Sequence, residues 1–294
     1  MKDGMELDLK NEMGLLRSNY YHQTRSLLHP AISCTETDVF KVNNGVFTFP
    51  YNFPFLKENV SHNLIRKLAV INAIYVKCFF EEDNVLDEYH LPPATFRKFI
   101  CRMCESRNFK TLATGQLVHL CGEKILEYVL EYESKYYSAV ISEKLDNDIS
   151  LENMLDEKNL RFLGFKFLPI CVSFAAFCLV ENLPEKISTC EELVINFQIG
   201  RQLIDDLKDL EKDLQQPDRS YIIKACQRSI ERDQPTIIDI ENLLLESNFD
   251  YEIARTIVRY MQAAEENACK LNFKIFLNQI RLYKHKAKMY ERKK

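Results

Sequence analysis

Three features are scarce in this sequence: tryptophan is absent, glycine occurs seven times, and no apolar stretch is long enough to cross a membrane. The longest apolar run, residues 167–180, has 14 residues, whereas a membrane-spanning helix needs about 20. We therefore expect this run to form a helix buried in a core. Because glycine is rare and long segments such as residues 62–80 repeat apolar residues at intervals of three and four, the sequence predicts an all-α fold.

An excess of basic charge is also missing. The formal net charge is −4, and both signs are spread along the chain, with a basic tail at residues 281–294 as the exception. Proteins that bind nucleic acid usually carry a basic face, so no nucleic-acid partner is predicted.

Cysteine occurs ten times, but the patterns of a disulfide framework or a zinc site are missing. We find no signal peptide and no repeated C-x-x-C pairs. Cys101 and Cys104 form one such pair, without a second pair or a histidine cluster to complete a zinc site. We therefore expect reduced thiols in a cytoplasmic protein without stable membrane insertion.

Four breaks divide the predicted helices. Proline, asparagine and capping residues cluster at residues 91–96, 144–150, 182–188 and 215–220. Residues 1–60 are expected to be an irregular N-terminal segment and a candidate cap for a pocket, most clearly over residues 28–57 with their three prolines. Residues 61–294 are expected to form one helical domain.

Residues 205–213 concentrate acidic side chains on a strongly helical segment. On a helix with 3.6 residues per turn, Asp205, Asp209 and Asp213 recur every fourth position and share one face. Like charges stacked in this way repel, by roughly 0.2–0.5 kcal/mol per neighbouring pair on an exposed helix. One interpretation is a solvated face of mixed charge, and the other is a face that binds cations.

A second acidic site favours the cation-binding interpretation. Asp83 and Asp87 are again four residues apart and end a long apolar segment. Two largely apolar helices that each end in carboxylates are expected to face one another across a cavity and hold cations. Oxygen ligands without nearby histidine or cysteine favour Mg²⁺, which shares its remaining positions with phosphate oxygens. The pattern therefore predicts a phosphorylated substrate.

These two sites carry a resemblance to a known family. The stretch DNVLD at residues 83–87 resembles the DDxxD motif of the class I isoprenoid (terpene) synthases, with Asn84 in place of the second aspartate. Residues 205–213 resemble the second metal motif of that family, in its NDxxSxxKE form or, with Gln202 and Asp206, in its QxxDDxxD form. The two motifs begin 122 residues apart, which suits opposing helices of that fold.

The resemblance implies a single-domain helical bundle around a central pocket. Three Mg²⁺ ions would bind the diphosphate of an allylic prenyl substrate and promote its departure as pyrophosphate. The implied metal ligands are Asp83, Asp87, Asp205, Asp209 and Asp213. Lewis-acid metal ions suit this chemistry because negative charge develops on the leaving oxygen.

The carbocation left behind needs an apolar cavity whose aromatic faces stabilise positive charge. Phe79 and Phe80 lie one turn before Asp83, and Tyr75 lies one turn deeper, so these three are the candidate catalytic aromatics. Plain core packing is the alternative for each of them.

Basic side chains are expected to bind the diphosphate, because arginine pairs with phosphate oxygens and lysine adds a point charge. The candidates are Arg161, Lys212, Arg281 and Tyr283. Arg281 and Tyr283 resemble a C-terminal Arg-Tyr pair of the cyclases with one residue inserted, whereas the true dipeptide, Arg259 with Tyr260, comes earlier in the chain. Each cation also has an interpretation as a surface charge.

One departure from the family pattern distinguishes its branches. Chain-elongating prenyltransferases have an arginine pair after the first motif, whereas here no arginine follows Asp87 until Arg97. A second substrate site is therefore expected to be missing, which favours a terpene cyclase that releases pyrophosphate from one substrate. The alternatives are a squalene or phytoene synthase-like condensing enzyme and, from another class, a non-catalytic helical scaffold. Members of the family are often dimers, so a homodimer is also open.

Overall fold

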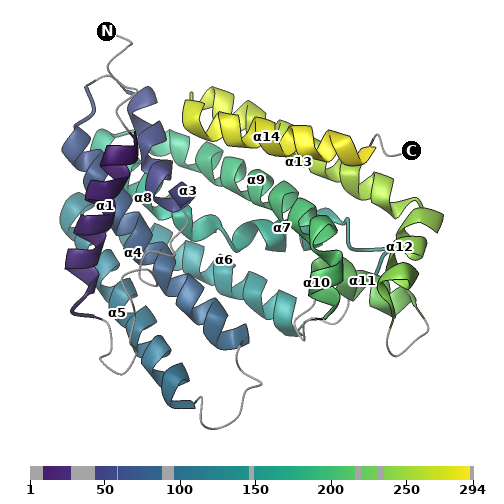
Figure 1. Ribbon diagram of the computed structural model, residues 1–294. Coiled ribbons are helices and arrows are strands. Elements are labelled where there is room, and N and C mark those ends of the chain that lie inside the picture. The colour runs from purple at the N-terminus through teal and green to yellow at the C-terminus, as the bar shows by residue number, and fades with distance from the viewer. Residues whose placement is uncertain are drawn as a thin grey trace. The chain divides into compact units, whose positions relative to one another are not determined.

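The computed structural model is helical throughout the part of the chain that it describes, with no strand there (Figure 1). The described residues are 9–27, 44–57, 59–87, 96–145, 149–215, 220–230 and 235–291. The prediction of an all-α fold is thus confirmed.

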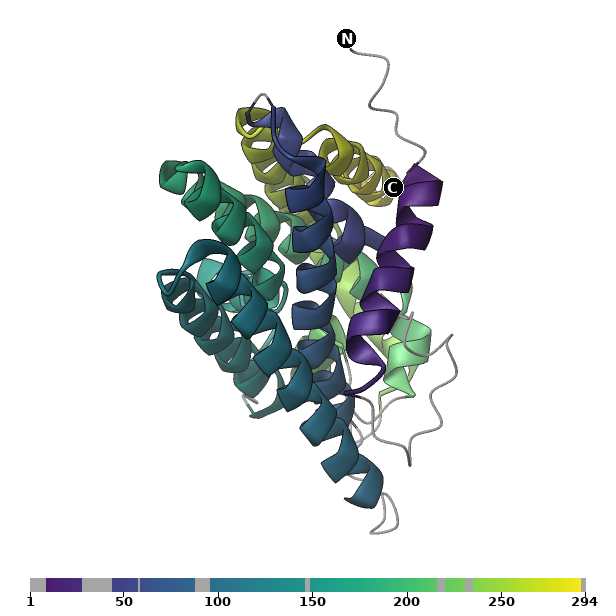
Figure 2. The same ribbon diagram turned by 90° about the vertical axis from the view of Figure 1, so that its left-hand side faces the viewer.

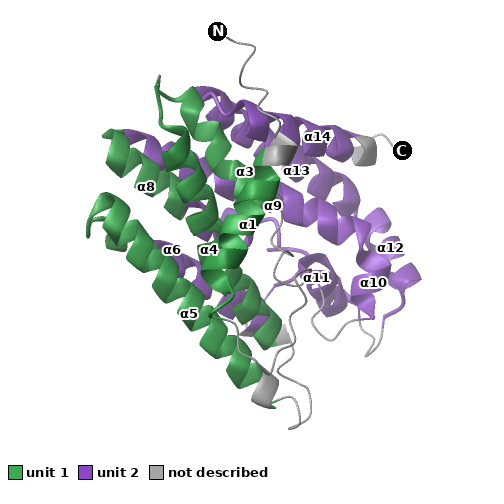
Figure 3. Ribbon diagram, turned by 60° about the vertical axis from the view of Figure 1, so that its left-hand side comes forward, with its two compact units in different colours: residues 1–129, 172–184 green, residues 130–171, 185–294 purple. Residues whose placement is uncertain are grey.

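The chain forms two compact units that interleave along the sequence (Figure 3). Unit 1 comprises residues 1–129 and 172–184, and unit 2 comprises residues 130–171 and 185–294. The chain therefore passes between the units three times, at places other than the boundary at residue 60 that the sequence suggested.

Unit 1 is built around two long helices. Its described elements are α1 (Leu9–Thr24), α3 (Asn44–Thr48), η1 (Phe49–Phe55), α4 (His62–Asp87), α5 (Phe96–Cys121) and α8 (Val172–Glu181). Figure 2 shows α1 and α5 beside α4. The ring of Phe53 packs at 5.1 Å from Phe174 and 5.2 Å from Phe177, so that η1 and α8 share one apolar cluster.

The N-terminal region is more ordered than the sequence suggested. The prediction of an irregular segment is wrong for Leu9–Thr24, which is helical, and for residues 44–55. Arg66 of α4 donates from Nε to Glu12 at 2.8 Å, and the Tyr51 hydroxyl donates to the same carboxylate at 3.1 Å. Helix α1 is held in place by this buried carboxylate, whose partners lie 39 and 54 residues away in sequence. Residues 28–43 lie outside the described part of the chain.

Unit 2 contains the remaining described elements. They are α6 (Ile125–Leu145), α7 (Glu157–Phe165), η3 (Leu168–Cys171), η4 (Pro184–Lys186), α9 (Ile187–Lys208), α10 (Leu210–Leu214), α11 (Tyr221–Ser229), α12 (Ile237–Glu246), α13 (Phe249–Lys270) and α14 (Lys274–Glu291). Two of these elements cross a boundary: α6 starts in unit 1, and η4 begins at the last residue of unit 1. Helix α13 lies along α9, and α14 lies along α13 (Figure 1).

Glycine lets α7 approach α9 closely. A Cβ atom added to Gly164 would lie 2.6 Å from Ile195 Cγ2 and 3.0 Å from the Ile195 carbonyl oxygen. Real Cβ atoms essentially never approach another heavy atom within 3.0 Å, so a larger residue there would require α7 or α9 to shift. A Cβ added to Gly200 would lie 2.8 Å from the flexible end of the Met261 side chain, which can move away more easily than Ile195 can.

Left-handed asparagines mark several helix ends. Four of them have positive φ values between 54° and 63°: Asn59, Asn182, Asn248 and Asn272. Asparagine tolerates this conformation better than most side chains, so it stops one helix and redirects the chain. The predicted break at residues 182–188 is confined to Asn182 and Leu183, because Pro184–Lys186 form η4 and α9 begins at Ile187. Another predicted break follows α10, which ends at Leu214. The predicted breaks at residues 91–96 and 144–150 lie partly outside the described residues.

The apolar run at residues 167–180 is buried, as expected for a core segment, and it forms η3 followed by α8. In the described residues no single helix is long and apolar enough to cross a membrane. By length and composition alone, one bent pair, Glu157–Phe165 with Leu168–Glu181, meets the requirement.

Candidate functional site

The acidic helix bends at Asp209, but its backbone hydrogen bonds from residue i to residue i−4 continue across the bend. Helix α9 stops at Lys208, Asp209 has φ −102° and ψ 14°, and α10 begins at Leu210. The Asp209 N–H donates to the Asp205 carbonyl at 2.9 Å, and the Asp213 N–H donates to the Asp209 carbonyl at 2.8 Å. The three aspartates of the predicted face are therefore joined by consecutive helical hydrogen bonds.

One carboxyl at this helix end lies in the interior. Asp206 is 2% exposed. It accepts hydrogen bonds from Gln202 Nε2 at 2.8 Å and from the backbone N–H of Ile222, in the first turn of α11, at 3.4 Å. Burial raises its pKa to about 7, assisted by the negative charges of Asp213 and Glu143, while the two hydrogen bonds act in the opposite direction.

Asp206 is the residue that the sequence reasoning undervalued. It was a member of one possible motif alignment but not a metal candidate. The apolar periodicity contains the missing signal: Ile199, Leu203 and Asp206 follow one another at intervals of four and three, so Asp206 lies on the core face of α9.

The other aspartates at this end are partly exposed. Arg201 Nη1 lies 3.3 Å from Asp205 Oδ2, and Lys208 Nζ lies 3.7 Å from Asp209 Oδ1. Partial burial raises the pKa of Asp213, and the negative charge of Asp209 raises it further. Two carboxylates that repel each other in this way, with only oxygen donors, have the chemistry that suits a hard cation.

The acids at the end of α4 have a different environment, because α5 supplies cations to them. Glu81 is buried and forms ion pairs with Lys77, one turn earlier, and with Arg102 Nε at 3.8 Å. Glu82 accepts a hydrogen bond from Ser106 Oγ at 2.6 Å and lies 3.6 Å from Lys110 Nζ.

The first predicted motif follows directly after these paired glutamates. Asp83 is partly buried, Asn84 is exposed, and Asp87 is the last residue of α4, with its side chain outside the described part of the structure. Asp83 and Asp87 belong to unit 1, whereas Asp205, Asp209 and Asp213 belong to unit 2. The expected pairing of the two motifs across a cavity stays a prediction.

The candidate aromatics are packed inside unit 1. Tyr75 and Phe79 are buried and meet edge to face, with ring centroids 5.1 Å apart. Lys110 Nζ lies 5.1 Å from the centre of the Phe79 ring, and Phe80 is half-buried. This packing agrees with the core interpretation of Tyr75 and Phe79, and their catalytic role stays a prediction.

Arg161 is engaged by an acid of its own unit. Its guanidinium donates to both carboxylate oxygens of Glu192, at 2.8 and 3.3 Å, and this raises its pKa. Glu192 precedes Asp205 by thirteen residues on α9, which corresponds to about 20 Å along a straight helix. The structure therefore does not bring Arg161 together with the aspartates of residues 205–213.

The two residues of the C-terminal candidate pair, Arg281 and Tyr283, contact different partners. Arg281 is exposed and forms an ion pair with Glu265 at 2.9 Å, while Tyr283 packs against Phe197 with centroids 5.5 Å apart. Lys212, the remaining candidate, is exposed on α10.

The earlier dipeptide lies near Arg161 instead. Burial raises the pKa of Tyr260, and the positive charges of Arg259 and Arg161 act to lower it. The Arg259 guanidinium lies 5.0 Å from the Tyr260 ring centre.

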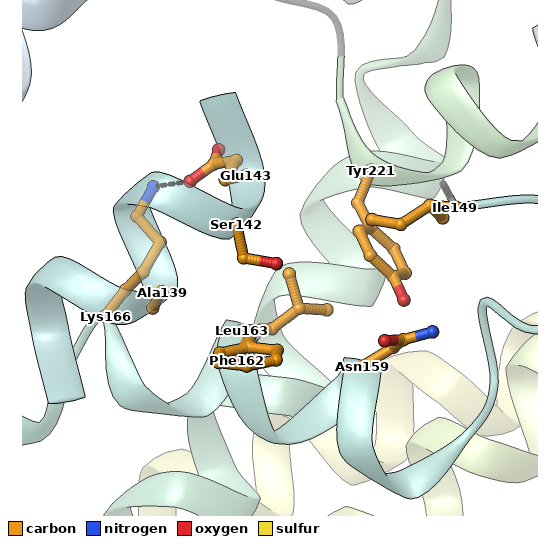
Figure 4. A pocket seen from close by; sticks show the side chains of 9 residues that line it. All are labelled: Ala139, Ser142, Glu143, Ile149, Asn159, Phe162, Leu163, Lys166 and Tyr221. Atoms are coloured by element: carbon orange, nitrogen blue, oxygen red, sulfur yellow. Dashed lines mark ion pairs between the residues drawn. The ribbon is translucent and has the colours of Figure 1, made fainter. Parts of the chain in front are cut away.

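A small void in unit 2 lies beside an ion pair (Figure 4). Lys166 Nζ contacts Glu143 Oε2 at 2.5 Å, and Lys224 Nζ donates to the Glu143 carbonyl at 2.7 Å. Tyr221, on another side of the void, donates its hydroxyl to the Met154 carbonyl at 2.7 Å. The space is about 20 Å³, enough for roughly one water molecule and far too small for a prenyl chain.

Within the described residues, no three histidine, cysteine, aspartate or glutamate side chains are gathered closely enough to hold a metal ion. The carboxylates at the end of α9 offer the oxygen donors that a hard cation prefers, but a complete ligand set needs side chains beyond this cluster. Comparison with known proteins finds no family, no curated relative and no solved structure that matches the chain.

Proposed function

We propose that this chain is a Mg²⁺-dependent class I terpene synthase, which ionises an allylic prenyl diphosphate, cyclises the carbocation and releases pyrophosphate. The observation that carries the proposal is the acidic end of α9 and α10. There, a buried Asp206 adjoins Asp209 and Asp213; partial burial raises the pKa of Asp213, and repulsion by the negative charge of Asp209 raises it further. A cation bound at this end would relieve that repulsion.

The roles proposed for the residues follow from their chemistry. Asp205, Asp209 and Asp213, together with Asp83 and Asp87, would hold Mg²⁺. The metal supplies Lewis-acid stabilisation to the departing pyrophosphate. Asp206 would fix the helix end, because the hydrogen bond that it accepts from the Ile222 N–H ties α9 to α11, and the one from Gln202 holds its carboxylate within α9.

Other side chains would bind or shield the substrate. Lys212, exposed on α10 beside Asp213, would add positive charge near the phosphate oxygens. The buried aromatic pair of Tyr75 and Phe79 would contribute apolar surface that excludes water from the carbocation.

The test is turnover. Purified protein is incubated with Mg²⁺ and, in separate reactions, geranyl, farnesyl and geranylgeranyl diphosphate, and the extracts are analysed by gas chromatography with mass spectrometry. We expect a cyclic hydrocarbon or alcohol from one substrate. Asp209→Asn should lower its formation on the order of 100-fold, because the transition-state charge loses a stabilising group. Glu211→Gln, an exposed acid on the same helix, is the matched control and should retain activity.

Absence of product from every single diphosphate would refute the one-substrate reaction. Pairs of diphosphates would then be tested for head-to-head condensation of the squalene or phytoene synthase type.

A non-catalytic helical scaffold is the second candidate, and the ion pairs of its acids and cations favour it. Glu81 and Glu82 are neutralised by α5, and Arg161 is neutralised by Glu192. Charges that are paired within their own unit fit a structural role, because breaking a buried ion pair is strongly destabilising. A scaffold would show neither turnover nor a rise in melting temperature with Mg²⁺ and pyrophosphate, whereas the synthase would show both.

A further inference from the structure

A hollow of about 460 Å³ opens on unit 1 between α1, α4 and α5. Figure 2 shows these three helices side by side. The volume falls within the range of roughly 300–1,000 Å³ that is usual for small-molecule sites. The hollow has no part in the synthase proposal.

Polar groups from all three helices line the hollow. Lys67 comes from α4, Gln116 and His119 from α5, and Gln23 from α1. The Gln116 side-chain amide donates to the Gln23 side-chain oxygen at 2.9 Å, so α1 and α5 are already linked at this place. The amide oxygen of Gln23 is thus occupied, whereas Lys67 and His119 each bring nitrogen atoms that can meet an anionic group.

Apolar side chains line the same hollow. Ile71 lies one turn beyond Lys67 on α4, and Leu112 and Leu120 lie two turns apart on α5. Each apolar position is therefore within one or two turns of a polar one, and the lining is amphipathic along both helices.

The charge of the lining is of one sign. No acidic side chain lines the hollow, although the whole chain carries a net charge of −4. In the described residues Lys67 makes no ion pair, unlike Lys57, Lys77 and Lys110 of the same unit. Because no acidic side chain accompanies Lys67 in the lining, its positive charge is complementary to an anionic ligand.

We propose that this hollow binds a small amphipathic anion. A carboxylate or phosphate head contacts Lys67 and His119, and a short alkyl chain covers Ile71, Leu112 and Leu120. The head supplies the negative charge that the lining lacks, and the chain removes apolar surface from water.

Three probes test the two parts of this ligand. Binding of decanoate, decyl phosphate and uncharged decanol to the full chain is measured by isothermal titration calorimetry below their micelle concentrations. We expect one site for decanoate, for decyl phosphate or for both, which tells a carboxylate head from a phosphate head, and weaker binding of decanol. Lys67→Gln should weaken binding of the anions about fivefold, in keeping with one partly exposed charge.

A pair of glycine variants distinguishes binding in the hollow from binding elsewhere on the surface. Gly115 lines the hollow, and a Cβ added there has no atom within 4 Å, so the position accepts a side chain and Gly115→Leu places a larger one in the hollow. Gly14 is an exposed helix glycine with equally open surroundings outside the hollow, which makes Gly14→Leu the matched control. We expect Gly115→Leu to abolish binding and Gly14→Leu to preserve it, with melting temperatures of both variants at or slightly above wild type, because leucine favours the helix over glycine.

Three results would overturn the proposal: no binding of either anion to the wild-type chain, equal binding to Gly115→Leu and wild type, or decanol binding as tightly as the anions. None of these results bears on turnover of prenyl diphosphates, so the two proposals fail separately.

Discussion

The ends of α4 and α9 look alike in sequence but differ in what surrounds their carboxylates. At the end of α4, Glu81 and Glu82 meet cations, among them Arg102 and Lys110 of α5. At the end of α9, no cation from another described helix pairs with Asp206, which is bound by an amide and a backbone N–H. An acidic run at a helix end can therefore be neutralised by cations of a neighbouring helix or left without them, and the packing of the other elements decides which.

This difference sets apart two motifs that look alike in the sequence. The acids around Asp83 end an apolar helix, yet their glutamate neighbours are neutralised within unit 1. The aspartates at the end of α9 are interspersed with lysines, yet they include a carboxyl whose pKa is raised to about 7. The repelling end of α9 is the better candidate for a cation.

Replacing the buried carboxyl should give the largest effect and test the α9 side of the comparison. The pKa of Asp206 is raised from 3.8 to about 7, so the folded state holds its proton more tightly than the unfolded state. The stabilisation from this proton is complete below about pH 4 and is lost as the pH rises through about 7. Relative to Asp206→Asn, the wild type should lose on the order of 4 kcal/mol of unfolding free energy across this window.

Urea denaturation of both proteins at several pH values measures this difference, and the other titrating groups cancel between them. Parallel stability curves for wild type and Asp206→Asn would show that Asp206 is ionised and solvated, and would remove the contrast between the two helix ends.

Breaking the ion pairs of α4 is expected to have the next largest effect. Glu81→Ala leaves Lys77 and Arg102 without their buried partner and should cost about 3 kcal/mol of unfolding free energy. Glu211→Ala on α10 removes an exposed acid and should stay within about 0.5 kcal/mol of wild type. Chemical denaturation at neutral pH compares the two, and equal small losses would mean that the glutamates of α4 are as weakly held as a surface charge.

Binding of Mg²⁺ with pyrophosphate tests whether the aspartates at the end of α9 hold a cation. Mg²⁺ with pyrophosphate, at about 100 times its dissociation constant, should stabilise the wild type by about 2.7 kcal/mol through mass action. Asp209→Asn should lose this gain. Thermal denaturation with Mg²⁺ and pyrophosphate measures the gain against the same protein in Mg²⁺-free buffer with chelator. A gain that survives in Asp209→Asn would place the cation elsewhere.

The smallest effect is expected from relieving the repulsion without metal. Because the charge of Asp209 raises the pKa of Asp213, Asp209→Asn should lower that pKa toward its ordinary value. It should also stabilise the metal-free protein by roughly 0.2–0.5 kcal/mol, as expected for one pair of like charges four residues apart. Carboxyl titration by nuclear magnetic resonance and a melting curve measure the two quantities. A less stable variant would mean that Asp209 serves α10 as a cap.

Much of the fold could be predicted because it depends on local pattern. The all-α class, the breaks near residues 182–188 and the burial of residues 167–180 follow from spacing, proline and asparagine, which act over a few residues. Helix α1 could not be predicted in this way, because its stability depends on Glu12 meeting Arg66 and Tyr51 far along the chain.

The candidate site shows the same limit. The spacing of Asp205, Asp209 and Asp213 was visible in the sequence, and the backbone hydrogen bonds of α9 and α10 agree with it. The neutralisation of Glu81 and Glu82 was not visible, because it depends on which face of α5 packs against α4. Charge pairing between helices is a property of tertiary structure, and no single-helix pattern contains it.

The interleaving of the two units sets an order on biosynthesis. Unit 1 is incomplete until residues 172–184 have been made, because Phe174 and Phe177 of α8 complete the cluster around Phe53. On a ribosome that adds about 5–20 residues per second, the 55 residues from 130 to 184 take roughly 3 to 11 seconds. During that interval, the nascent chain must keep the unfinished core of unit 1 from associating with other chains, so a stalled ribosome at this stage would present an aggregation-prone intermediate to chaperones.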